Sequence, residues 1–176
     1  MAETDAMEIR RNLRPGDVGE MIALHGRIYS EEWGHDATFE AMVAQSFAGP
    51  GARGFPRERE GIWIVEEDGS LVGCLGLTDE GDGEARLRWF VFEPHLRGRG
   101  LGRRLLTELF AEAERNGYER ITLETFSDLA AAAHLYREHG FELVWEDTRP
   151  RWSRTAVTYQ RYERRLGSPV ASTSAA

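Results

Sequence analysis

Apolar and polar positions change their period near the turn "RPGD" at the start of the chain. Residues 7–13 alternate weakly between the two kinds of side chain, which is typical of a strand. Asp17 can cap a helix that then runs to about Tyr29. The buried stripe expected for this helix consists of Met21, Leu24 and Ile28.

The next stretch combines a second helix with a hairpin. A helix fits 36–48, whereas 49–60 is rich in Gly, Pro and charge, which predicts a loop. Two apolar runs, 61–67 and 70–78, flank an Asp-Gly dipeptide, and this arrangement predicts a β-hairpin.

Strands and helices alternate in the second half of the chain. A strand begins at Glu84 and is ended by Pro94, and a helix then runs to about Asn116. A further strand is expected over 120–126. The helix after it, 129–139, can be capped by Ser127 or Asp128.

The last elements are two strands, expected over 141–147 and 155–164. The tail 167–176 is small and polar, and we expect it to be disordered. No repeat or linker divides the rest. We therefore expect one domain over 7–166, of the α+β class, with one mixed sheet.

The composition narrows the class of protein. The 176 residues are 41% hydrophobic and 30% charged, which is typical of a soluble globular protein. No apolar run is long enough for a membrane span, and the N-terminus lacks a signal-peptide pattern. A single cysteine, Cys74, excludes an internal disulfide framework. We expect a cytoplasmic protein with no membrane partner.

The charge excludes further classes. A net charge of −8 argues against general nucleic-acid binding. All 22 basic residues are arginine, so the chain has no lysine for a Schiff base or a nucleotide P-loop. The five histidines show no metal-ligand spacing, and we expect no metal.

The stretch "LRGRGLGRRLL", residues 96–106, concentrates glycine and arginine between a strand and a helix. Glycine lets a ligand approach the backbone closely, and the free N–H groups of a helix start favour an anion. The spacing matches neither the P-loop nor the dinucleotide fingerprint. It is R-x-x-G-x-G, from Arg97 to Gly102.

With the strand before it, this motif resembles the acyl-coenzyme A signature of the GNAT family of N-acyltransferases. The later segments "ITLETF" and "LYREHGFELV" look like that family's fifth strand and the step after its fourth helix. The resemblance covers roughly 7–166. It implies a central mixed, mostly antiparallel sheet with splayed parallel fourth and fifth strands and about four helices. The segments "RPGD", "HGRIYSEEWG" and "ERITLETFSDL" look closest to the acetyltransferase domain fused to MarR-type regulators.

The resemblance implies acetyl-CoA as co-substrate. The backbone of the fourth strand would pair with its pantetheine arm, at Trp89, Phe90, Val91 and Phe92. The turn would hold its pyrophosphate, through Arg97, Gly98, Arg99, Gly100, Leu101, Gly102 and Arg103. Many members carry an asparagine where this chain has Leu129, and Ser127 or Asp128 can replace that contact.

The resemblance also implies the catalytic groups. Tyr136 matches the family's usual general acid, which protonates the leaving thiolate. The fourth strand has no glutamate in its middle, so Glu124 on the fifth strand is the first candidate for the base. The expected activity is transfer of an acetyl group to a primary amine of a small molecule or peptide.

The acceptor is expected among acidic and aromatic side chains, namely Tyr29, Glu31, Glu32, Trp33, His35, Asp36, Trp145, Asp147 and Trp152. These suggest an amine or cationic acceptor. Two alternatives stay open, a non-catalytic acyl-CoA-binding module and a different phosphate ligand on the same turn. A homodimer also stays open.

Overall fold

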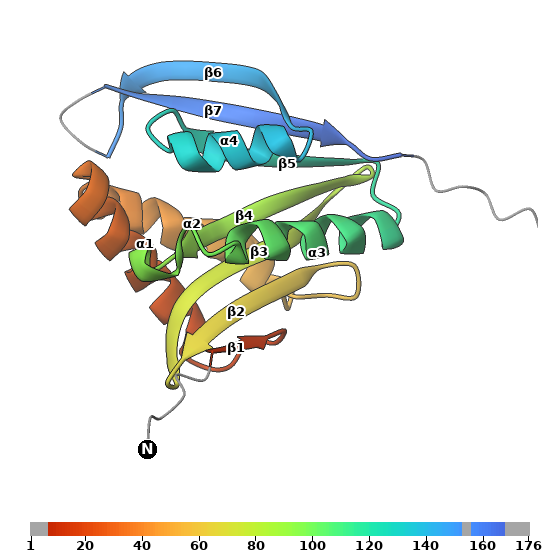
Figure 1. Cartoon of the computed structure of the whole chain (residues 1–176), viewed down its shortest axis with the longest axis horizontal. Coiled ribbons are helices and arrows are strands. Elements are labelled where there is room, and N and C mark those ends of the chain that lie inside the picture. The colour runs from red at the N-terminus through yellow and green to blue at the C-terminus, as the bar shows by residue number, and fades with distance from the viewer. Residues whose placement is uncertain (1–6, 153–155, 168–176) are drawn as a thin grey trace, which may run out of the picture.

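The computed structural model describes residues 7–152 and 156–167, which form one sheet with helices on both faces (Figure 1). In chain order the elements are β1 (Met7–Arg10), α1 (Asp17–Trp33), α2 (Ala37–Ala52), β2 (Gly61–Glu67), β3 (Ser70–Gly81), β4 (Glu84–Phe92), the short 3₁₀ helix η1 (Pro94–Leu96), α3 (Leu101–Arg115), β5 (Arg120–Phe126), α4 (Ala130–Glu138), β6 (Glu142–Pro150) and β7 (Ala156–Arg165). The expected α+β class with one mixed sheet is confirmed.

The seven strands lie in the order β1-β2-β3-β4-β5-β7-β6. Every neighbouring pair is antiparallel except β4 and β5, which are parallel. A parallel pair needs a crossover connection, and α3 supplies it. The expected splay is also present, because the β4–β5 ladder covers only Glu84–Leu87 against Arg120–Leu123. Beyond Leu87 the two strands separate towards the left of Figure 1.

Two apolar layers pack on the sheet. Side chains from α3 and α4 pack on one face, with Leu105, Leu106 and Leu109 fully buried. Side chains from α1 and α2 pack on the other, around Met21 and Ile28. Strand side chains alternate between the two faces of a sheet, so β4 contributes side chains to both layers. The helix pairs α1/α2 and α3/α4 therefore pack on opposite sides of β4.

Three predictions about helix ends were wrong. Helix α2 continues to Ala52, although 49–60 was expected to be a loop. Pro50 lies in its last turn with a buried ring, where the missing N–H removes only one hydrogen bond. Asp17 does not cap α1. It is the first helical residue, and its carboxylate binds the Arg10 guanidinium at 2.9 and 3.0 Å.

The third error concerns the start of α4. The residue before the helix is Leu129, and no side chain caps the helix, so neither Ser127 nor Asp128 has that role. The expected tail falls on residues that are not described here, apart from Gly167. Within the described ranges, no helix has the length and apolar character needed to cross a membrane.

Candidate active site

A cavity of about 750 Å³ opens where β4 and β5 separate. Its walls come from elements far apart in the chain: α1 and α2 on one side, α4 on the other, and the glycine turn at one end. The separated strands supply its floor, with Arg86–Phe92 from β4 and Leu123–Phe126 from β5. Because the ladder stops at Leu87, backbone groups of β4 beyond it face the gap rather than a neighbouring strand.

A bulge shapes β4 at this point. Two residues of β4, Trp89 and Phe90, lie opposite the single residue Leu75 of β3, and Trp89 has φ 54°. The Trp89 ring stacks on Phe47 at 4.0 Å between centroids, and its Nε1 donates to Ser46 Oγ at 2.8 Å. These contacts compensate for the strained backbone, which bends the strand at the cavity.

The side chains of Trp89, Phe90, Val91 and Phe92 pack in the two apolar layers, while the backbone edge of β4 beyond Leu87 is left free by β5. Trp89 and Val91 pack in the α1/α2 layer, and Phe92 packs in the α3/α4 layer with Phe90 against it. The expected role of these four residues in pantetheine binding concerns their backbone, and it stays a prediction.

Two glycines give the turn before α3 its conformation. Gly98 and Gly100 have φ of 71° and 81°, a region that other residues rarely adopt. A Cβ at either position would meet no protein atom within 4 Å, so the backbone is bare towards open space. At Gly102 a glycine is favoured by close packing instead, since a Cβ there would lie 3.2 Å from the Phe90 ring. The turn therefore leaves space for an anion next to the first N–H groups of α3, which have no partner within the helix.

The arginines of the turn divide into two groups. Arg97 and Arg103 line the cavity, and each is bound to a glutamate of a neighbouring helix. Arg97 Nη1 lies 2.7 Å from Glu32 Oε2 of α1, and Arg103 Nη2 lies 2.6 Å from Glu138 Oε2 of α4. Arg99 and Leu101 lie outside the lining. Both phosphate-binding candidates thus already have a carboxylate partner that an anion must share or displace.

Tyr136 lies on α4 against the cavity and is 5% exposed. Its ring packs near Phe90, Phe141 and Tyr162. Burial raises the pKa of the Tyr136 phenol well above its ordinary value, so the hydroxyl keeps its proton. A thiolate leaving in the same apolar surroundings would also have a raised pKa, which preserves the match that proton transfer needs.

Glu124 lies on β5 just beyond the last rung of the β4–β5 ladder, and its side chain is 34% exposed. Its Oε2 accepts a hydrogen bond from the Tyr159 hydroxyl of β7 at 2.8 Å. Its Oε1 lies 3.8 Å from Arg86 Nη1. Sequence reasoning missed both neighbours, since only the antiparallel β5–β7 pairing brings Tyr159 here.

The remaining candidates are only partly brought together. Ser127 is exposed and lies outside the cavity lining, whereas Asp128 and Leu129 are part of it. Among the proposed acceptor-side residues, Tyr29, Glu32 and Trp33 line the cavity. The other proposed acceptor-side residues do not line it. His35 is buried among aromatic rings, and Asp36 caps α2. Within the described part of the chain, no group of three or more His, Cys, Asp or Glu side chains could hold a metal.

Comparison with known proteins defines the class. A family model described as "Acetyltransferase (GNAT) family" matches residues 19–141. An uncharacterized N-acetyltransferase of Schizosaccharomyces pombe is 32% identical over 117 residues, 65% of this chain and 70% of that protein. The uncharacterized N-acetyltransferase YjgM of Escherichia coli is 36% identical over 85 residues, 47% of this chain and 51% of its own length. An amino-acid acetyltransferase of Shewanella oneidensis is 30% identical over 59% of this chain, which covers 23% of that protein.

Solved structures agree in fold. A GNAT-family acetyltransferase from Staphylococcus aureus Mu50 superposes with a TM-score of 0.69 at 18% identity, over 92% of this chain and all of that one. One from Streptococcus pneumoniae gives 0.67 at 20% identity, with the same coverage. At these identities the likeness shows the fold alone. Taken with the family match, the chain belongs to the GNAT family of acetyltransferases.

Proposed function

We propose that this protein is an acetyl-CoA-dependent N-acetyltransferase that acts on a primary amine of a small molecule or peptide. The observation that carries the proposal is the pairing of a bare glycine turn at the start of α3 with a cavity between separated parallel strands. The turn suits a pyrophosphate, and the lining of the cavity also includes a tyrosine and a glutamate, Tyr136 and Glu124.

The residues present fit acetyl-CoA. The turn leaves open space at Gly98 and Gly100, and Arg97 and Arg103 border the cavity there. The backbone of Trp89–Phe92 would hold the pantetheine arm along the edge of β4 that β5 leaves free. Ser127, Arg99 and Leu101 lie outside the lining and would meet the donor only at the rim of the cavity.

Bound acetyl-CoA would supply the thioester whose carbonyl carbon is attacked. The acceptor amine forms the C–N bond as the C–S bond breaks. One amine proton passes to a Glu124 oxygen, and the Tyr136 hydroxyl gives its proton to the departing sulfur. Backbone positioning of the two reactants supplies the rest of the acceleration.

The proposal is tested by following free-thiol release from acetyl-CoA with amino acids, polyamines, aminoglycosides and peptides as acceptors. We expect release that depends on one acceptor class, with the acetylated product seen by mass spectrometry. Tight acetyl-CoA binding without release for any amine would instead support a non-catalytic acyl-CoA-binding module. No acetyl-CoA binding would support a different phosphate ligand on the turn.

The setting of this activity is part of the same proposal. We place the protein in the cytoplasm, with the amine acceptor as its partner and without nucleic acid, membrane or metal, and a homodimer stays open. The resemblance to the acetyltransferase domain fused to MarR-type regulators also stays a prediction. It would be tested by co-purification of the chain with such a regulator.

A further inference from the structure

Charged side chains gather at the closed end of the gap between β4 and β5. We call this group the charged cluster. Its ion pairs link four arginines with three glutamates, namely Arg86, Arg88, Arg120 and Arg161 with Glu80, Glu84 and Glu124. They come from β3, β4, β5 and β7. Three of them, Arg86, Arg88 and Glu124, line the cavity of the active site.

Each glutamate of the charged cluster is already held by close hydrogen bonds. Glu84 accepts from Thr122 Oγ1 at 2.8 Å, Arg120 Nε at 3.0 Å and Arg161 Nη2 at 3.1 Å. Glu80 accepts from Thr78 Oγ1 at 2.7 Å and Arg88 Nη2 at 3.0 Å. Glu124 accepts the hydrogen bond from Tyr159 described above, so each of the three carboxylates has a hydrogen-bond donor other than Arg86.

Arg86 is the exception in the charged cluster. Its nitrogens lie 3.7 Å from Glu84, 3.8 Å from Glu124 and 4.0 Å from Glu80, distances too long for hydrogen bonds. Its Nε is buried and has no hydrogen-bond partner among the described residues. The side chain is 19% exposed, and Arg86 is part of the cavity lining. A guanidinium held this way lacks the planar bidentate partner it prefers.

We propose that the acceptor carries a carboxylate next to its amine, as an α-amino acid does, and that Arg86 binds that carboxylate. This inference rests on the proposed function and names its substrate class. Among the described residues Arg86 has only ion pairs of 3.7 Å or longer, so a carboxylate in the cavity would be its first close partner.

The spacing also fits this class. Arg86 faces Thr122 on the third rung of the ladder, and Glu124 lies two residues further along β5, where the strands begin to separate. With Arg86 Nη1 only 3.8 Å from Glu124 Oε1, groups bound to the two side chains are close neighbours. In an α-amino acid a single carbon joins amine and carboxyl carbon. The amine would therefore lie beside Glu124 while the carboxylate contacts Arg86.

The test compares matched acceptors. Phenylalanine, leucine and methionine are each compared with their α-amides, at equal concentrations of free amine, by thiol release from acetyl-CoA. We expect kcat/KM to favour the acids by about tenfold or more, the size of one charge-assisted contact. Equal or better activity with the amides, or a clear preference for polyamines, overturns the inference and leaves the proposed function intact.

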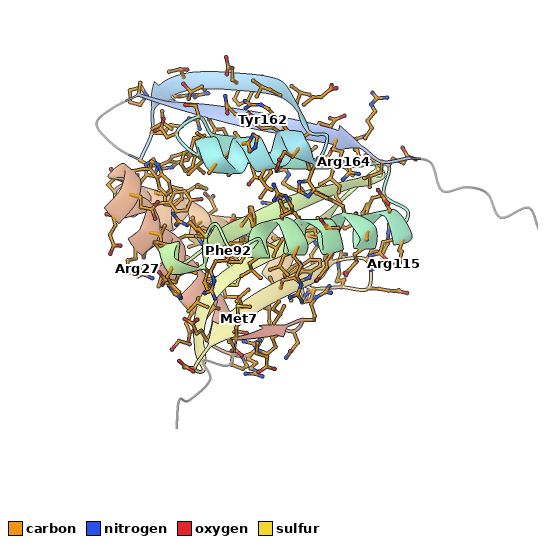
Figure 2. The ribbon with its side chains drawn as sticks, in the orientation of Figure 1. Met7, Arg27, Phe92, Arg115, Tyr162 and Arg164 are labelled. Carbon is orange, nitrogen blue, oxygen red and sulfur yellow. The ribbon has the colours of Figure 1, made fainter. Side chains whose placement is uncertain are left out.

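Substitution separates Arg86 from a general effect on the fold. Arg86→Gln should reduce the acid-to-amide ratio to about one, chiefly through KM of the acid, and Arg86→Lys should restore part of it. Arg115→Gln, at the far end of α3 from the turn, is the matched control and should keep the full ratio (Figure 2). Thermal unfolding of each variant checks that it folds. An unchanged ratio in folded Arg86→Gln overturns the inference.

A binding experiment keeps the two proposals distinguishable. Calorimetry measures phenylalanine and phenylalaninamide directly against the protein and against Arg86→Gln. Tighter binding of the acid that is lost in the variant supports the carboxylate site even if no thiol is released. In that case the proposed catalysis fails while the inferred ligand class stands. Equal binding of acid and amide to the unaltered protein overturns the inferred class.

Discussion

The two ends of the candidate active-site cavity present polar groups of different kinds. At the glycine turn the available polar groups are backbone N–H donors of one continuous stretch, which has positive φ at Gly98 and Gly100. At the closed end they are side chains from four strands, joined by ion pairs around Arg86. The backbone of the turn borders open space at Gly98 and Gly100, whereas the side chains of the closed end contact one another.

This difference affects how each end responds to change. A side chain added at Gly98 or Gly100 would meet no protein atom within 4 Å, so it would affect the binding of a ligand rather than internal packing. In the charged cluster each residue has several partners, so a substitution there changes its neighbours as well. We expect the turn to govern donor affinity and the closed end to govern the chemical step and the choice of acceptor.

The largest effect is expected from Gly100→Val. A branched side chain at φ 81° would extend into the space where a phosphate is proposed, and acetyl-CoA affinity should fall by more than about 100-fold, the equivalent of two charge-assisted contacts. Calorimetry measures it. Gly117→Val is the matched control, with φ 74° and equally open space at the other end of α3. If both variants bind acetyl-CoA alike, the turn does not hold the phosphates.

Tyr136→Phe should have the next largest effect. Loss of the hydroxyl should lower kcat by about 100-fold while the KM for acetyl-CoA stays within a small factor, because general-acid help acts only on the chemical step. The ring remains packed near Phe90 and Phe141, so thermal stability should change little. Steady-state kinetics with the best acceptor decides it. A rise in KM without a fall in kcat would assign Tyr136 to binding.

Glu124→Gln tests the other side of the proton transfer. If Glu124 is the base, the acid limb of the kcat/KM profile against pH should disappear in this variant, and the rate should fall by about tenfold or more. The same limb should remain in Tyr136→Phe, which leaves Glu124 and its Tyr159 contact in place. An acid limb that survives in Glu124→Gln would point to solvent or to another carboxylate as the proton acceptor.

The comparison also explains which parts of the site could be predicted from the sequence. The turn is encoded in consecutive residues. Its prediction as an anion site follows from the conformational freedom of glycine and from its place between a strand and a helix. The α+β class with one mixed sheet followed from alternating patterns and an Asp-Gly turn, whereas the splay of β4 and β5 was expected only from the family resemblance. Helix ends were less predictable, because Asp17 and Ser127 resemble capping residues while Asp17 is bound by Arg10 and Leu129 precedes α4.

The closed end could not be predicted because its parts meet only through the sheet. Arg86, Glu124 and Tyr159 are remote in sequence, and their contact depends on the parallel β4–β5 rungs and the antiparallel β5–β7 register. That the Arg86 guanidinium donates no hydrogen bond within the described part of the chain is likewise a property of distances in the folded cluster. Neither the acidic net charge nor the aromatic composition indicated that Arg86 would line the cavity.

The smallest expected effect concerns the turn end of the cavity. Glu32 of α1 binds Arg97 at 2.7 Å, so its carboxylate would compete with the proposed phosphate for the same guanidinium. Glu32→Gln should raise acetyl-CoA affinity by about two- to fivefold, since partly exposed ion pairs contribute at most about 1 kcal/mol. Glu31→Gln is the control, because its neighbour is Arg27 at 3.8 Å and not Arg97. The gain should shrink as salt is raised, because salt screens such pairs. Weaker binding in Glu32→Gln would mean that Glu32 orients Arg97 for the donor rather than competing with it.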